Sequence, residues 1–336
     1  MKKKAIGQII ACSIIGVILT GLLASAICVL PAVGVVQNCD VSAEPIRNAV
    51  DSVTDAFSNL PVPHVKVSNL PGTIWNETFS DQGYTAGNGV YETAPDQIDI
   101  SWALGRVVVV ASDAADQIRL TEWIGDVDPK TAAAAEISGT YQMRHKLSDG
   151  KLSVKQFRGG LSVLSTLFEA SKTLLIELPK SSLNKLSIEG ASVNIDLTDL
   201  SVEKLDVDLA AGSMRIESCT ITLVDGDLAS SKGSFTNCSI DKIDIDAAAA
   251  ELTFDLVKTP AKIDIDAAAG TYRFELPADA SFTADVDSFA ARVKITGFAN
   301  ASTNKGKTVV GSGENRFDFD MAAGSVTIEA RAENKF

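Results

Sequence analysis

Pairs of aspartates recur along the second half of the chain, and their type and spacing could support chemistry. Each pair has the form Asp-apolar-Asp, and the members are Asp206 and Asp208, Asp225 and Asp227, Asp244 and Asp246, and Asp264 and Asp266. Carboxylates at this density could bind a divalent cation, because calcium and magnesium prefer oxygen ligands, or they could bind a basic surface. The alternative is a solvated sheet face whose charges prevent aggregation and hold neighbouring strands in register.

Paired carboxylates also act as the acid and base of glycoside hydrolysis. A catalytic pair is needed once, in a cleft, whereas these pairs recur from segment to segment. The sequence has no Gly-rich phosphate loop or nucleophile elbow, and neither His64 nor His145 lies near a cysteine at metal-ligand spacing. We therefore predict no catalytic residue, no cofactor and no specific metal site, and we treat the eight aspartates as weak cation candidates.

Two cysteines, Cys219 and Cys238, occupy the same position in consecutive segments. If the segments stack in register, their Cα atoms lie about 4.8 Å apart, within the range of about 4.4–6.8 Å that a disulfide accepts. Stacked side chains point the same way, however, which strains a bridge. The sequence leaves two alternatives open, a disulfide between adjacent rungs or two buried thiols that pack as small apolar groups.

A repeat with steps of 19 or 20 residues must position these side chains, and its segments open at Leu186, Leu205, Val224, Ile243, Ile263 and Phe282. Further copies open at Phe317 and, earlier in the chain, at Ile98. Each copy has two runs of period-two alternation around a bend of small residues, which is typical of strands with one buried face. Stacking such units buries a continuous core. We predict an all-β fold, a β-solenoid with about 19 residues per rung over residues 98–332, in preference to a β-sandwich.

The repeat also places a basic residue directly before most openers, namely Lys185, Lys204, Lys242, Lys262 and Arg316. Because these residues share the outward face with the aspartates, the sequence predicts one basic column beside two acidic columns. The lysines would compete with any metal ion for the carboxylates. We therefore expect cation binding on this face to be weak and diffuse.

The N-terminal segment has the pattern of a membrane anchor. Lys2, Lys3 and Lys4 precede an uncharged stretch over residues 5–36, and residues 9–30 alone would span about 33 Å as a helix, which matches the hydrocarbon core of a bilayer. We predict that residues 1–4 are a cytoplasmic tail and residues 5–36 a single transmembrane anchor. A cleaved signal peptide is the alternative.

The charges around this stretch predict its orientation. The lysines precede it and Asp40 and Glu44 follow it, so the positive-inside rule places the bulk of the chain outside the cytosol. Residues 37–97 are expected to form a short juxtamembrane helix and a linker. The net charge of −13, with no Lys/Arg cluster beyond the first four residues, argues against nucleic acid as a partner.

Several segments carry a family resemblance: YTAG from Tyr84, IDISWALGRVVV from Ile98, LLIELPKSSLNKLSIEGAS from Leu174 and GSGENRFDFDMAAGSVTIEA from Gly311. In their order and spacing over residues 84–330 they resemble the bacterial putative-adhesin β-strand-repeat family, the DUF4097 domain. Alanine often stands where that family tends to have Ser-Gly at the bend. The resemblance implies a β-solenoid of the bacterial envelope, and because the family has no established catalytic residues it implies none here.

Together these patterns predict a single-pass protein of the bacterial cytoplasmic membrane with a non-catalytic, extracytoplasmic solenoid. We expect it to be a structural or binding module whose partner is an envelope or cell-surface component. An accessory role in envelope-stress sensing is the alternative, and an enzyme acting on polysaccharide is the least favoured class.

Overall fold

The computed structural model describes residues 83–131, 142–156, 171–304 and 307–331. All regular secondary structure in these residues is β-strand. None of the described residues forms a helix that is long and apolar enough to cross a membrane. The predicted anchor (residues 5–36) and juxtamembrane helix lie outside the described residues.

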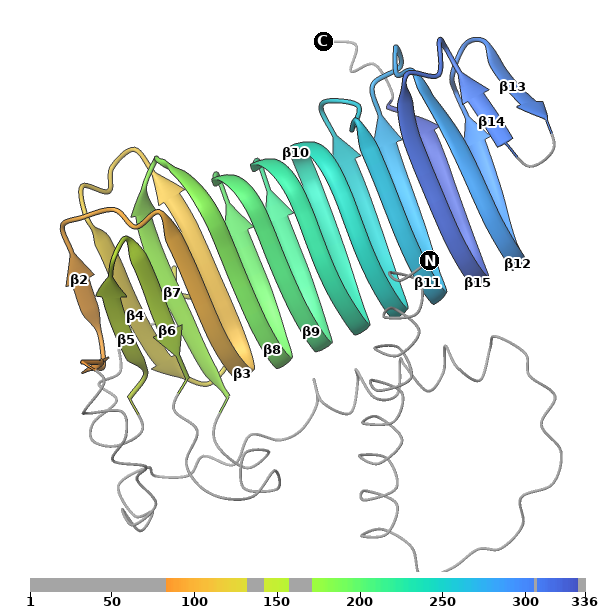
Figure 1. The fold of residues 1–336 in the computed structure, drawn as a ribbon. Coiled ribbons are helices and arrows are strands. Elements are labelled where there is room, and N and C mark those ends of the chain that lie inside the picture. The colour runs from red at the N-terminus through yellow and green to blue at the C-terminus, as the bar shows by residue number, and fades with distance from the viewer. Residues whose placement is uncertain (1–82, 132–141, 157–170, 305–306, 332–336) are drawn as a thin grey trace, which may run out of the picture.

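The body of the molecule is a stack of long, parallel strands that bend halfway along their length (Figure 1). The neighbours in the stack, in spatial order, are β3 (Gln97–Ser112), β8 (Ser182–Thr198), β9 (Ser201–Glu217), β10 (Thr220–Leu256), β11 (Lys262–Leu276), β15 (Asn315–Ala330) and β12 (Phe282–Thr296). β10 is long enough to supply two consecutive rungs. The all-β stack that the period predicts is therefore confirmed.

The register agrees with the predicted columns through most of the stack. Leu186 pairs with Leu205, and Ile243 pairs with Ile263. The early copy is also a rung, because Ile98 pairs with Leu186 although 88 residues separate them in sequence. Inward residues of adjacent rungs lie on one another, as expected for a continuous core.

The predicted opener Phe282 is wrong, and the spatial order of the last two rungs differs from their order in the chain. β15 lies between β11 and β12, so Phe317 pairs with Ile263 on one side and with Ala284 on the other. The opener of β12 is thus Ala284, two residues after Phe282. The small Ala284 side chain leaves room for the Phe282 ring, which stacks on Phe317 with centroids 4.6 Å apart. Asp285 and Asp287 consequently continue the two acidic columns.

The core is aliphatic with one aromatic column. The rings of Phe235, Phe254 and Phe274 stack with centroid distances of 4.5 and 4.8 Å, and all three are fully buried. Such offset stacks add to the free energy gained by burying the rings. The rungs are held together by this column as well as by backbone pairing.

The corner of each rung is built from small residues. Gly212 has a φ of 137°, and a Cβ there would lie 2.0 Å from the carbonyl oxygen of Val193 on the adjacent rung. Five residues after each opener the chain places an alanine: Ala103, Ala191, Ala210, Ala229, Ala248, Ala268 and Ala322. In β12, counted from Ala284, this position is Phe289. We call this set the corner column.

The N-terminal end of the stack is covered over both halves of β3. β6 (Lys151–Lys155) pairs with the first half, followed outward by β5 (Arg144–Ser148) and β1 (Thr85–Ala86). β7 (Lys172–Pro179) pairs with the second half, followed by β4 (Ile118–Ile124) and β2 (Gly89–Tyr91). β1 and β2 lie in the segment for which the sequence predicts a linker.

The C-terminal end is covered differently. β14 (Lys307–Val310) pairs with β12 only from Phe282 to Asp285, and β13 (Ala301–Asn304) pairs with β14. Beyond Asp285, no strand in the described part of the chain pairs with the outer edge of β12.

Candidate functional site

The eight candidate aspartates form one acidic face on the first half of each of the four rungs that β9, β10 and β11 supply. Asp206 pairs with Asp225 and Asp208 with Asp227, while Asp244 pairs with Asp264 and Asp246 with Asp266. We call the set that includes Asp206, Asp225, Asp244 and Asp264 the first column. The second column consists of Asp208, Asp227, Asp246 and Asp266. The structure brings all eight together as the repeat predicts, with rungs about 4.8 Å apart.

Lysines neutralise much of the first column. Asp206 contacts the ammonium groups of Lys185 at 2.5 Å and Lys204 at 3.5 Å, and Lys204 also contacts Asp225 at 2.5 Å. Lys262 lies 2.6 Å from Asp264. Burial alone would raise the pKa of Asp206, but the ion pairs with the two lysines lower it below its usual value. The basic column therefore binds the carboxylates diagonally from rung to rung.

The second column lacks this compensation at three positions. Asp208, Asp227 and Asp246 make no ion pair with any lysine or arginine that the structure describes. Partial desolvation, followed by repulsion from Asp227, raises the pKa of Asp208 to about 6. Desolvation, followed by repulsion from Asp266, raises the pKa of Asp246 to about 6. Both side chains are exposed. We therefore expect that replacing either aspartate with asparagine would mainly remove the repulsion between stacked carboxylates.

This column predicts that stability decreases as the pH rises through the range from about 4 to 6. A folded-state pKa above the unfolded value means that the folded chain binds more protons in this window, so deprotonation disfavours it. The double variant Asp208→Asn and Asp246→Asn should raise the free energy of unfolding at pH 7.5 by about 0.5–1 kcal/mol after solvent screening. At pH 4 it should have no effect. Urea unfolding at both pH values measures this difference.

Asp206→Asn is the matched control, because it removes a paired carboxylate from the same face. The lowered pKa of Asp206 contributes stability above pH 4, so this variant should be less stable than the wild type at pH 7.5. If the double variant and the control shift stability in the same direction, the two columns do not differ in the way described.

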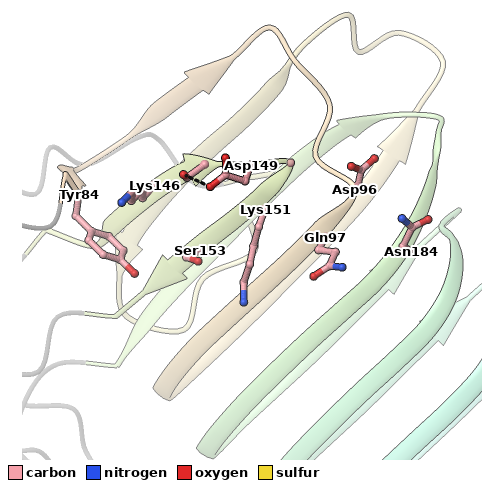
Figure 2. A pocket seen from close by; sticks show the side chains of 10 residues that line it. Tyr84, Asp96, Gln97, Lys146, Asp149, Lys151, Ser153 and Asn184 are labelled. Carbon is pink, nitrogen blue, oxygen red and sulfur yellow. Dashed lines mark hydrogen bonds between the residues drawn. The ribbon is translucent and has the colours of Figure 1, made fainter.

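A polar hollow lies beside the start of the acidic face, where β5 and β6 meet β3 (Figure 2). It has a volume of 770 Å³ and is lined by Tyr84, Asp96, Gln97, Lys146, Ser148, Asp149, Gly150, Lys151, Ser153 and Asn184. Lys151 also contacts Asp99, which lies in the first column of β3. The hollow carries both signs of charge and thus favours neither an anion nor a cation.

A buried polar cluster in the N-terminal cap was not predicted from the sequence. The Lys172 ammonium lies 3.0 Å from the Glu122 carboxylate, and both side chains are almost fully buried. The other Glu122 oxygen accepts a 2.7 Å hydrogen bond from the Met143 amide. Nearby in the same cap, the Tyr91 hydroxyl lies 2.6 Å from His145 Nδ1, and burial lowers the pKa of His145. Fifty residues separate Glu122 from Lys172, so no local pattern could indicate their contact.

Both cysteines are free, buried thiols in the structure. The Cys219 thiol donates to the Glu217 carbonyl at 3.3 Å, and the Cys238 thiol donates to the Thr236 carbonyl at 3.4 Å. Burial raises the pKa of Cys219 to about 12 and also raises that of Cys238. Because the thiolate is the reactive form, both groups are poor nucleophiles at neutral pH.

We expect Cys219 and Cys238 to alkylate at least about a hundredfold more slowly than a free cysteine at pH 7.5. Iodoacetamide labelling of the native and the urea-unfolded chain, followed by peptide mapping, measures the rates. After unfolding without a reductant, both peptides should label completely. Labelling that requires a reductant would instead show the disulfide that remains the alternative.

The acidic face presents repeated negative charge on an open surface. No three His, Cys, Asp or Glu side chains in the described residues are arranged to hold a metal ion. The carboxylates recur from rung to rung on an open face. Weak cation binding by the eight aspartates stays a prediction.

The chain matches one protein family and is similar to solved structures of two bacterial proteins. A family model described as Toastrack DUF4097 matches residues 129–329, which confirms the resemblance predicted from the sequence. A putative cell adhesion protein from Clostridium sporogenes shares 8% identity, with a TM-score of 0.33 over 74% of this chain and 100% of its own. A putative adhesin from Bacteroides fragilis shares 13% identity, with a TM-score of 0.36 over 73% of this chain and 97% of its own. No curated protein is significantly similar to the chain.

Proposed function

Because the chain belongs to the Toastrack family of DUF4097 domains, we propose that it is a membrane-anchored, extracytoplasmic module of the bacterial cell envelope. In this proposal the solenoid binds or supports other envelope components and does not catalyse a reaction. The observation that carries the proposal is the repetition of the acidic face. Its carboxylates extend across successive rungs from Asp206 to Asp266, as suits a surface that meets an extended partner.

The membrane anchor in this proposal rests on the sequence. Lys2, Lys3 and Lys4 precede the uncharged residues 5–36, and such a stretch is long enough to span a bilayer. The solenoid would then lie outside the cytosol, and the net charge of the whole chain, −13, favours solubility and basic partners.

Protease added to spheroplasts of a bacterium that expresses the full chain should degrade the solenoid while a cytosolic marker survives. The matched control replaces Lys2, Lys3 and Lys4 with glutamate, which removes the signal for orientation and should increase the protected fraction. A solenoid that resists the protease in intact spheroplasts but not after lysis would contradict the extracytoplasmic placement.

Envelope sensing is the second candidate function. The observation that favours it is the pair of carboxyls with a pKa near 6, Asp208 and Asp246, which would change the charge of the acidic face over a mildly acidic range. A binding measurement at two pH values distinguishes adhesion from sensing. A sensing module should change its binding of envelope components between pH 5 and pH 7.5, and the Asp208→Asn and Asp246→Asn double variant should lose that change.

A further inference from the structure

The two ends of the stack differ in how they are covered. Strands cover both halves of β3 at the N-terminal end, whereas at the C-terminal end the second half of β12 is left uncovered by the described strands. At the N-terminal end, β7 lies on the second half of β3 and buries Leu174 and Ile176 beside the inward residues of that rung. At the C-terminal end, the corresponding outer edge of β12 over residues 286–296 has no strand on it in the described part of the chain. We call this the open edge.

The open edge exposes an inward residue whose neighbours in the adjacent rungs are buried. Val293 belongs to the inward column of Tyr272 and Val326, which are fully buried, but it is 43% exposed. Phe289 occupies the corner column, which points to solvent in most rungs, as at Ala210 and Ala322, and its ring is 97% exposed. Exposed apolar groups beside an unpaired strand edge are typical of interaction sites.

The charges at the two ends indicate the chemistry of the missing strand. Arg106 on β3 and Arg292 on β12 occupy the same outward column, eight residues after their openers. At the N-terminal end, Asp126 from the covering layer contacts Arg106 at 2.6 Å. Arg292 makes no ion pair with any residue that the structure describes, and Lys294, also on the open edge, contacts Glu329 of β15 at 3.2 Å. The open edge is thus the position where a covering layer with carboxylates is absent.

We propose that the open edge of β12 binds an extended polypeptide segment from a partner protein, in which apolar residues alternate with acidic ones. The segment pairs with the backbone of β12 as an additional strand. Its apolar side chains cover Val293 and Ile295 while its carboxylates face Arg292 and Lys294. This is strand addition to a free sheet edge, in which backbone hydrogen bonds give affinity and alternate side chains give specificity. The edge is separate from the acidic face, and the inference does not depend on the function proposed for that face.

The two cations on the edge favour an acidic partner over a second copy of the chain. Two open edges brought together would place Arg292 and Lys294 of one copy against those of the other, and like charges across paired strands are destabilising. A strand with glutamates at these two positions would instead continue the alternation of opposite charges seen elsewhere in the stack, as between Arg273 and Glu329 at 2.9 Å.

The test uses the full chain in detergent and a fluorescein-labelled peptide, AGEVEIEA, measured by fluorescence anisotropy. The peptide follows residues 323–330 of β15, the strand that pairs with the other edge of β12, with glutamate at the two positions that face Arg292 and Lys294. We expect saturable binding below about 1 mM, and at least about tenfold weaker binding of AGKVKIKA. Failure of AGEVEIEA to bind, or equal binding of the two peptides, would overturn the proposal.

Variants of the chain sharpen the result. Arg292→Glu reverses a charge that faces the peptide and should weaken AGEVEIEA binding by about tenfold. Lys232→Glu changes the same outward column in the middle of the stack and should leave binding unchanged. Arg292→Glu should also bind AGKVEIEA better than AGEVEIEA, which a general loss of folding would not produce. Self-association of the chain without peptide binding would show that a second copy occupies the edge and would refute the acidic partner.

Discussion

Replacing Glu122 with glutamine is expected to lower the free energy of unfolding by about 3–5 kcal/mol, the usual result of removing one member of a buried ion pair. Glutamine keeps the size of the side chain and an oxygen that can accept the Met143 hydrogen bond. The variant therefore removes mainly the negative charge 3.0 Å from the Lys172 ammonium. Denaturant unfolding of the wild type and the variant, monitored by circular dichroism, measures the loss.

The double variant Glu122→Gln and Lys172→Met is the informative control. The double variant leaves neither member of the pair without its counter-charge, so it should regain part of the stability that Glu122→Gln loses. The loss that persists includes the attraction of Glu122 for the buried Arg144 guanidinium. Equal losses in the single and the double variant would show that packing around Lys172, and not its charge, determines the stability of the cap. Lys172 also anchors the cap through its carbonyl, which accepts a 3.1 Å hydrogen bond from Trp102.

Replacing Phe254 with alanine is expected to cost about 3–5 kcal/mol of stability. Its ring lies between those of Phe235 and Phe274, with centroids 4.5 and 4.8 Å away, so its removal leaves a cavity bounded by rungs that are fixed by backbone pairing. The same urea unfolding experiment applies. In a stack whose rungs contact only their neighbours, the loss should appear as a lower midpoint or as a separate unfolding phase.

Phe289→Ala is the matched control for this substitution, because it deletes the same atoms from a ring that is 97% exposed. It should change the free energy of unfolding by less than about 0.5 kcal/mol. A comparable loss in both variants would mean that the Phe289 ring is covered in solution.

The sequence allowed the columns to be predicted because they depend on a short, regular period. Inward and outward positions alternate strictly in each half-rung, so Asp206 and Asp225 could be placed side by side without knowledge of the whole fold. The disposition of the acidic face was predictable for the same reason. The period could not predict that lysines neutralise the first column of aspartates but leave three positions of the second column unpaired. That difference depends on how far individual lysine side chains reach.

Features without a period could not be predicted. Glu122 and Lys172 meet because β4 and β7 pair as antiparallel neighbours in the cap, and neither segment carries the repeat. The position of β15 was missed because the opening runs of several rungs, such as those at Ile263 and Phe317, are similar enough to pair in more than one order. The open edge depends on this order and could not be recognised before it was known.

The place of β15 also has a consequence for synthesis on the ribosome. β12 leaves the ribosome before β15, although β15 must lie between β11 and β12. While residues 315–330 are still in the exit tunnel, the edge of β11 is vacant and β12 is the neighbouring strand able to occupy it. Any such early pair would have to separate before the final strand enters, so we expect an additional step late in folding. A stop codon before residue 315 would remove β15, which lies between β11 and β12. The truncated chain would therefore lack the rung that joins β12 to the rest of the stack.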